Sequence, residues 1–132
     1  MNIKSSQTLV DEAQKNIETL APSKVRVLHE KKEITLIDVR DIRELWKEGT
    51  VENSMHIPRG MIEFWLDPES SYYKEKKIKD IKKMVLFCAL GWRSALATKS
   101  LADMGFKNIA HVNGGFDALK KTGIKIIEKE KK

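Results

Sequence analysis

Residues 84–94 have the sequence MVLFCALGWRS, in which a run of four apolar residues leads directly into Cys88. Such a run is typical of a strand that is buried on both faces of a parallel sheet. From Ser94 onward, apolar residues recur at helical spacing until Gly105, and glycine commonly ends helices. The stretch therefore predicts a buried strand, a short loop and a helix over residues 94–104.

The same alternation extends in both directions from this stretch. On the N-terminal side, ITLIDV at residues 34–39 is a second apolar run rich in β-branched residues, and a helical pattern over residues 41–47 follows it. On the C-terminal side, IAHV at residues 109–112 precedes a glycine turn and a last helix over residues 116–121. Strands that alternate with helices form right-handed βαβ units. We therefore expect an α/β fold with an open parallel β-sheet of about five strands, flanked by helices on both faces.

The remaining segments carry weaker patterns. Residues 1–20 have apolar side chains at roughly helical spacing, which predicts an N-terminal helical extension. Residues 124–132 are rich in lysine, and we expect a solvated C-terminal tail there. The domain itself is expected over residues 21–123. Its minor elements are predicted as a helix at 23–29, a short strand at 54–57, a helical turn at 64–66 and a polar loop at 69–83.

Length and composition limit the class of protein. At 132 residues the chain has the size of one domain, which can bury a core without disulfide or metal support. Cys88 is the single cysteine, which excludes an intrachain disulfide and any zinc or iron–sulfur site built from several cysteines. No apolar run reaches the roughly 18 residues of a membrane span. We therefore expect no cofactor, no metal and no membrane partner, and a cytoplasmic location in which the thiol stays reduced.

The net charge of +6 raises the question of a nucleic-acid partner. The lysines gather in residues 74–83 and 120–132, and no aromatic side chains are interleaved with these two runs as single-strand binding would require. A solvated loop and a solvated tail explain them better. We therefore expect no nucleic-acid partner, and at most a weak steering of anionic substrates.

Polar and reactive residues follow two of the predicted strands. Asp38 and Arg40 lie at the end of the first apolar run, and Cys88 ends the second. In an open parallel sheet, ligands bind beyond the carboxyl ends of the strands, so these residues are expected to lie near one another. The loop after Cys88 can direct several backbone N–H groups to one point, and the helix that follows adds positive potential there. A helix N-terminus and a nearby arginine both favour thiolate, so Cys88 is a candidate nucleophile.

Four segments together resemble the rhodanese family of sulfur-carrying domains. They occur in the order typical of that family, and they span roughly residues 34–123. They are LIDVR at 36–40, NSMHIPRG at 53–60, CALGWRS at 88–94, which has the form C-x-x-G-x-R-S, and NGGFDAL at 113–119. The chain departs from the family pattern at Ser54, where alanine is usual, and at Leu119, where tryptophan is usual; we expect packing substitutions there.

The resemblance implies a sulfurtransferase that works through a Cys88 persulfide. The thiolate would take sulfane sulfur from a donor such as thiosulfate or a persulfide. It would then pass this sulfur to cyanide, a small thiol or an acceptor protein, as in covalent ping-pong catalysis. His56 is expected to be structural, and Cys88→Ser to abolish transfer with little change in stability because the loop is expected to be exposed. The remaining site residues are expected to bind substrate (Ala89, Leu90, Gly91, Trp92, Arg93 and Ser94), to support the loop (Asp38 and Arg40), and to line the pocket mouth (Arg59).

Three alternatives remain open from the sequence. Cysteine phosphatases and related arsenate reductases resemble this loop but use C-x5-R, one residue longer than the C-x4-R from Cys88 to Arg93, so this activity is disfavoured. A sulfur-relay or persulfide-sensing module with little turnover is favoured by the apolar Leu90 and Trp92. A nucleic-acid module rests on charge alone. Arg93 itself either binds anions or pairs with a carboxylate such as Asp38 or Glu44.

Overall fold

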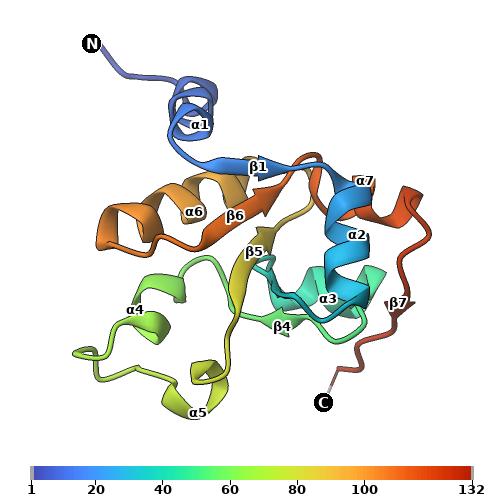
Figure 1. The fold of residues 1–132 in the computed structure, drawn as a ribbon. Helices are drawn as coiled ribbons and strands as arrows, with labels where there is room; N and C mark the ends of the chain where they lie inside the picture. Colours follow the sequence, from blue (N-terminus) through green and yellow to red (C-terminus); the bar gives the residue numbers. More distant parts are fainter. Residues whose placement is uncertain (1, 132) are drawn as a thin grey trace.

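A computed structural model describes residues 2–131 of the chain and contains seven helices and seven strands within that range (Figure 1). The helices are α1 (Ser6–Lys15), α2 (Pro22–Glu30), α3 (Ile42–Glu48), α4 (Ile62–Leu66), α5 (Glu75–Ile78), α6 (Trp92–Met104) and α7 (Gly115–Lys121). The strands are β1 (Glu18–Leu20), β2 (Ile34–Asp38), β3 (Thr50–Val51), β4 (Met55–His56), β5 (Lys83–Phe87), β6 (Ile109–Val112) and β7 (Ile126–Ile127).

Five of these strands form one parallel sheet in the order β1-β6-β5-β2-β4. The predicted α/β class and the expected number of strands are therefore confirmed. The register places Asp38 of β2 beside Phe87 of β5, so the two strands end at the same level of the sheet. This alignment brings the segments that follow them, at Val39 and Cys88, to one edge.

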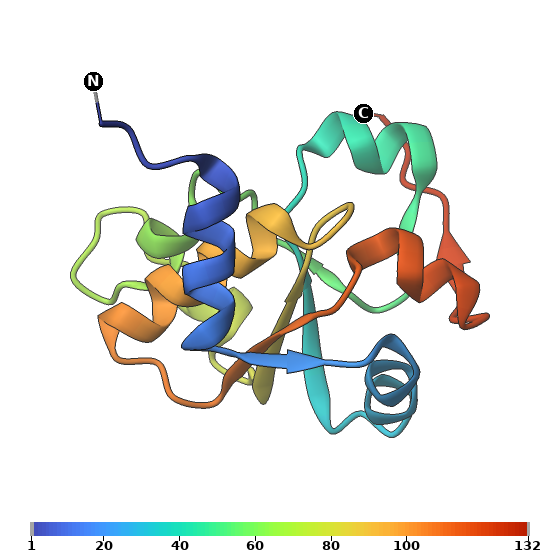
Figure 2. The same ribbon diagram turned by 90° about the horizontal axis from the view of Figure 1, so that it is seen from above.

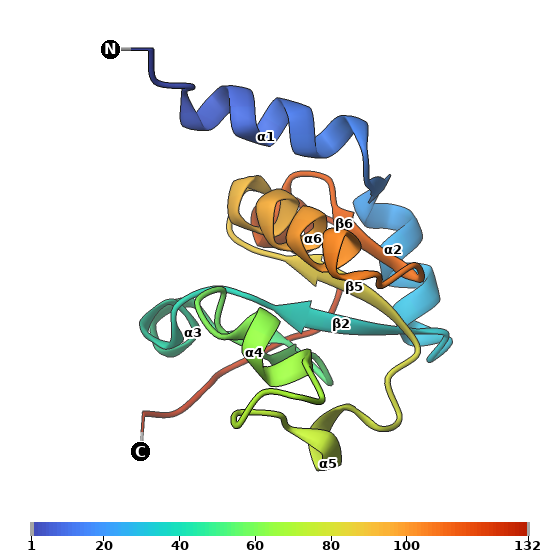
Figure 3. The same ribbon diagram turned by 90° about the vertical axis from the view of Figure 1, so that its left-hand side faces the viewer.

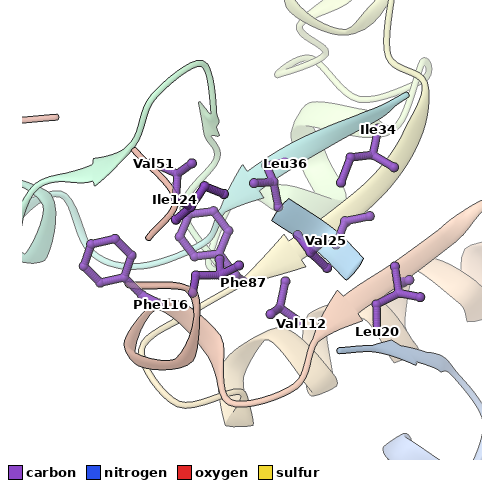
Figure 4. Close-up of a cluster of buried hydrophobic side chains, with 12 residues drawn as sticks. Leu20, Val25, Ile34, Leu36, Val51, Phe87, Val112, Phe116 and Ile124 are labelled. Atoms are coloured by element: carbon purple, nitrogen blue, oxygen red, sulfur yellow. The ribbon is translucent and has the colours of Figure 1, made fainter. Parts of the chain in front are cut away.

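Helices cover both faces of the sheet, as Figure 2 shows from above. Side chains alternate between the faces along each strand, because successive strand residues point in opposite directions. Leu36, Val85 and Phe87 pack with α2, α7 and the 119–124 region, in the cluster drawn in Figure 4. Ile37 and Leu86 pack on the opposite face, against α4 and α6. Both faces of the central strands are buried, which explains their continuous apolar sequence.

The N-terminal segment differs from the predicted helix over residues 1–20. The helix α1 ends at Lys15, and residues 18–20 form β1, which adds a parallel edge strand to β6. The backbone pairing with β6 and the burial of Leu20 outweigh the helical spacing of the apolar residues. The helix α1 lies over α6 (Figure 3), and its buried side chains Val10 and Ala13 pack against Ala95 of α6.

The C-terminal segment also differs from the solvated tail expected over residues 124–132. Ile124 is buried in the same cluster as Phe87, and β7 pairs antiparallel with β3. Lysines and glutamates surround the three isoleucines of this segment and hid the signal, although Ile124 and Ile126 pack against the domain. Removal of residues after Gly123 would therefore remove part of the core.

Candidate functional site

The site begins where β5 ends at Phe87 and the chain turns into α6. Residues 88–91 connect the two elements, and α6 starts at Trp92, two residues earlier than predicted. Val39, which follows β2, donates its backbone N–H to the Phe87 carbonyl (3.0 Å). The sequence prediction that the two apolar strands end side by side is therefore confirmed.

The Cys88 sulfur lies directly at the N-terminus of α6. The backbone N–H groups of Gly91 and Ser94 donate to Sγ at 3.1 and 3.3 Å, and the Ser94 hydroxyl lies 3.5 Å away. The first turn of a helix leaves backbone N–H groups without intrahelical partners, and the helix dipole is positive there. Sγ thus caps α6 in place of a capping side chain from Gly91, which has none. The sulfur therefore faces the positive ends of two backbone N–H dipoles.

The burial of Cys88 corrects one expectation. The sequence predicted an exposed loop position, but the residue is 1% exposed and packs with the cluster on the α6 face. The loop folds inward because the carbonyls of Cys88 and Ala89 accept hydrogen bonds from the backbone N–H groups of Phe116 (2.7 Å) and Asp117 (3.2 Å). Burial removes water from the sulfur, so the two amides interact with it more strongly than they would at a surface.

Two glycines allow the loop to take this shape. Gly91 has a φ of +106°, a conformation that residues with a Cβ resist. Gly115 has a φ of +62°, and a Cβ built on it would lie 2.4 Å from the Cys88 carbonyl oxygen and 2.7 Å from that of Ala89. The close approach of the 114–116 turn to the loop therefore depends on the absence of a side chain at position 115.

Replacing Gly115 with alanine is expected to push this turn away from the Cys88 loop. The left-handed conformation alone costs a residue with a Cβ about 1–2 kcal/mol, and the overlap with two carbonyls adds to it. Chemical denaturation should therefore show a loss of about 2 kcal/mol or more. Gly60→Ala is the matched control, because nothing lies within 4 Å of a Cβ there and its φ is ordinary. Equal stability of the two variants would contradict the account of the loop.

The Arg93 side chain pairs with Glu44 of α3 and forms no hydrogen bond with the sulfur. Its two terminal nitrogens donate to the two carboxylate oxygens at 2.6 and 3.0 Å. The hydrogen bond from Arg93 lowers the pKa of Glu44, and the same bond raises the pKa of Arg93. Of the two roles left open by the sequence, the structure contains the carboxylate pairing, with Glu44 as the partner.

This pairing predicts opposite effects of two substitutions on thiol reactivity. Arg93→Ala leaves the Glu44 carboxylate unpaired near the loop, so thiolate is disfavoured and alkylation of Cys88 by iodoacetamide at neutral pH should slow. Glu44→Gln leaves the arginine charge uncompensated, so alkylation should become faster. Both side chains are partly exposed, so solvent screens their charges, and an effect of roughly threefold in each direction is expected. Unchanged rates in both variants would assign the pair to structure alone.

Asp38 and Arg40 form a buried ion pair beneath the loop. The Asp38 carboxylate accepts from Arg40 Nη2 (2.8 Å), from Arg40 Nε and backbone N, and from the Thr50 hydroxyl (2.7 Å). The Arg40 guanidinium also donates to the Gly49 carbonyl and lies 4.0 Å from the centre of the Phe116 ring. Phe116 in turn donates to the Cys88 carbonyl. The arrangement links the pair to the loop through one aromatic residue, and neither side chain forms a hydrogen bond with Sγ.

The other predicted residues lie around the loop in different settings. Leu90 and Trp92 are 53% and 57% exposed, so both present apolar surface to solvent. Arg59 pairs with Glu63 of α4, which also accepts a hydrogen bond from Ser100 of α6. In residues 2–131, no hydrogen bond or ion pair joins Arg59 to the loop, so its place at a pocket mouth stays a prediction. The His56 ring contacts the Arg40 carbonyl (2.8 Å), consistent with the structural role expected for it.

One set of residues was missed by the sequence analysis. The Ser94 hydroxyl lies 3.0 Å from Nδ1 of His111 on β6, and Nε2 of that ring lies 3.1 Å from the Thr19 hydroxyl on β1. A histidine inside an otherwise apolar strand is a signal that could have singled out His111. Thr19 could not have been found, because its segment was expected to be helical.

Two further features are absent from residues 2–131, the part of the chain that the structure describes. No group of three or more His, Cys, Asp or Glu side chains is arranged to hold a metal ion in that range. Over the same residues, none of the helices has the length and apolar character that a membrane crossing needs.

Comparison with known proteins identifies relatives over most of the chain. The family model described as "Rhodanese-like domain" matches residues 21–122. The mouse thiosulfate sulfurtransferase/rhodanese-like domain-containing protein 3 is 33% identical over an alignment of 89 residues that covers 64% of this chain. The chain spans 57% of the length of that relative, and 62% of a similar relative from Schizosaccharomyces pombe.

Two solved structures extend the comparison to nearly the whole chain. A Rhodopseudomonas palustris protein, described as of unknown function and a possible tyrosine phosphatase, is 40% identical with a TM-score of 0.89, covering 96% of this chain and 97% of its own. The polysulfide-sulfur transferase homodimer from Wolinella succinogenes is 34% identical with a TM-score of 0.70, covering 93% of this chain and 87% of that chain. Both agree with the fold described above.

Proposed function

Because the chain belongs to the rhodanese-like domain family, we propose that it is a sulfurtransferase that carries sulfane sulfur as a persulfide on Cys88. The observation that supports this most strongly is the position of Sγ, which accepts hydrogen bonds from two backbone N–H groups at the N-terminus of α6. Such preorganised donors stabilise negative charge on a reacting atom without any rearrangement. A sulfur that must ionise, attack and then carry a second, anionic sulfur needs this stabilisation at each step.

The first half-reaction loads the domain. The Cys88 thiolate attacks the outer sulfur of the donor, the new S–S bond forms, and the bond between that sulfur and the rest of the donor breaks. The donor remainder leaves with the electron pair, as sulfite from thiosulfate or as a thiolate from a persulfide. The backbone N–H groups of residues 89–94 are the candidates to surround the added sulfur.

The second half-reaction unloads it. An acceptor thiolate or cyanide attacks the terminal sulfur of the persulfide, and the electron pair of the broken S–S bond returns to Cys88 as thiolate. Donor and acceptor thus use the same site in turn, which is the basis of ping-pong kinetics.

The surface around the loop supports a donor with apolar or protein character over a small dianion. The one cationic side chain in the loop, Arg93, has its charge compensated by Glu44. Leu90 and Trp92 both expose most of their surface beside the loop. A persulfide or polysulfide donor, or a persulfide carried by a protein, is therefore proposed ahead of thiosulfate. The same surface supports the second candidate, a sulfur-relay module that passes sulfur to a partner protein with little turnover on small donors.

Steady-state kinetics test the proposal and rank the donors. We expect glutathione persulfide with a thiol acceptor to give a higher kcat/KM than thiosulfate with cyanide, and initial rates to give parallel double-reciprocal plots. A higher kcat/KM for thiosulfate would overturn the proposed order of donors. Absence of transfer from every small donor, with transfer from a protein persulfide, would favour the relay module.

A phosphatase activity is the remaining candidate, and the description of the Rhodopseudomonas relative makes it worth testing. The four residues between Cys88 and Arg93 form a smaller cradle than the five of cysteine phosphatases, and Arg93 is engaged by Glu44. We therefore expect no hydrolysis of p-nitrophenyl phosphate under conditions in which sulfur is transferred. Hydrolysis that is lost in Cys88→Ser would contradict this expectation.

A further inference from the structure

A line of hydrogen bonds runs sideways through the protein from the Cys88 sulfur to the edge of the sheet. It passes from Sγ to the Ser94 hydroxyl (3.5 Å), then to Nδ1 of His111 (3.0 Å), and from Nε2 to the Thr19 hydroxyl (3.1 Å). The register sets its path, because Thr19 of β1 lies beside His111 of β6. Cys88, Ser94 and His111 are all buried, whereas Thr19 is exposed.

The middle member of this line, His111, is a neutral imidazole. Burial lowers the pKa of His111 to about 4, so the ring carries no charge near neutral pH. The charged side chains on the strands and the helix around it are paired. Glu18 of β1 pairs with Lys83 of β5. On α6, Arg93 pairs with Glu44 of α3, and Lys99 pairs with Asp103 of the same helix. A neutral imidazole has one N–H donor and one acceptor nitrogen, and it can exchange the two.

The line can therefore be fully hydrogen-bonded with its donors pointing either toward Thr19 or toward Cys88. With the proton on Nε2, the ring donates to Thr19 and accepts from the Ser94 hydroxyl at Nδ1, and Ser94 accepts the Cys88 S–H. With the proton on Nδ1, the ring donates to Ser94, whose hydroxyl is then free to donate to a thiolate. Every buried polar atom along the line is satisfied in both directions, which avoids the cost of an unpaired buried group.

We propose that His111 is a positioning residue whose ring proton moves from Nε2 to Nδ1 when Cys88 ionises, so that the Ser94 hydroxyl turns from accepting the S–H to donating to the thiolate. The proton balance is closed along the line. The thiol proton passes to the Ser94 oxygen, the Ser94 proton to Nδ1 and the Nε2 proton to the Thr19 oxygen, whose own hydroxyl proton is released to water. One proton leaves, and the only new charge is on sulfur.

The proposal assigns a task to a part of the chain that the family match does not include. Thr19 lies outside residues 21–122, so the outer end of the line comes from the N-terminal segment. The inference rests on the proposed function only in requiring that Cys88 ionises. Its test therefore observes the histidine ring and not sulfur transfer.

Nitrogen-15 NMR of the histidine side chains in the wild-type protein provides this test, because the shifts of Nδ1 and Nε2 distinguish the two neutral tautomers. As pH is raised from about 5, we expect His111 to stay neutral and to change from the Nε2–H to the Nδ1–H form. The midpoint should coincide with the ionisation of Cys88 followed at its Cβ. In Cys88→Ser, which has no thiol to ionise, the change should be absent. A tautomer that stays constant through the ionisation of Cys88, or a change that persists in Cys88→Ser, would overturn the proposal.

A matched pair of substitutions at the outer end separates this role from simple packing. Thr19→Val keeps the shape but removes the hydroxyl, so the Nε2–H form loses its acceptor and the Nδ1–H form loses its donor, and the midpoint of the tautomer change should shift away from the wild-type value. Thr19→Ser keeps the hydroxyl, so its midpoint should equal that of the wild-type protein. Because Thr19 is exposed, neither variant is expected to disturb the fold. Identical midpoints in both variants would show that the line ends at His111 and would remove Thr19 from the proposal.

Discussion

Cys88→Ser is expected to lower sulfur transfer by about 1,000-fold or more, the order of loss that follows removal of a nucleophile that forms a covalent intermediate. A serine hydroxyl does not ionise near neutral pH and cannot hold a persulfide. The backbone amides of Gly91 and Ser94 would still be present, but the atom on which they act would not be. The measurement is the rate of transfer to a thiol acceptor at saturating donor.

The same substitution is expected to have a smaller effect on stability, although not a negligible one. Because Cys88 is 1% exposed, the serine hydroxyl would be buried, and burial of a hydroxyl costs free energy unless it is hydrogen-bonded. Here the N–H groups of Gly91 and Ser94 offer partners, so the free energy of unfolding should fall by only about 1 kcal/mol. A variant that is folded by this measure but retains more than a tenth of the wild-type rate would contradict the role of Cys88.

Asp38→Asn is expected to cause the largest loss of stability, about 3 kcal/mol, because it leaves the fully buried guanidinium of Arg40 with only the partly exposed Glu48, 3.8 Å away, as a counter-charge. Asparagine has nearly the same shape, so packing is preserved and the charge is the quantity tested. Since Arg40 contacts the Phe116 ring, and Phe116 holds the Cys88 carbonyl, sulfur transfer should also fall in the fraction that remains folded.

Asp41→Asn is the matched control for this prediction. Asp41 also pairs with an arginine two residues away, Arg43, but both side chains are exposed to solvent. Asparagine serves as well as aspartate at the start of a helix, where Asp41 caps α3. Denaturant unfolding should show almost no change for Asp41→Asn. If the two variants were equally stable, the buried pair would not support the loop as described.

The parts of the structure that follow from local pattern were predictable. The strand β5, the glycine-containing loop and α6 each carry their own signal, and the shared level of β2 and β5 follows from parallel pairing. The helix predicted over residues 41–47 likewise agrees with α3 to within one residue at each end. These features depend on residues that are neighbours along the chain.

The features that were missed depend on contacts between distant segments. β1 and β7 are each two or three residues long, and only pairing with β6 and β3 makes them strands. The inward position of Cys88 depends on hydrogen bonds from the turn at Gly115, and the choice of Glu44 by Arg93 depends on where α3 packs. The hydrogen-bond partners of His111 are Ser94 and Thr19, which lie 17 and 92 residues away in sequence.

If Cys88 carries the transferred sulfur, intact-protein mass spectrometry detects it directly. After incubation with glutathione persulfide and removal of the donor, the wild-type mass should increase by one sulfur atom, the increase should map to the peptide that contains Cys88, and addition of a thiol acceptor should reverse it. Cys88→Ser should show no gain under the same treatment. A wild-type protein that transfers sulfur without gaining this mass, or a gain of the same size in Cys88→Ser, would contradict the account.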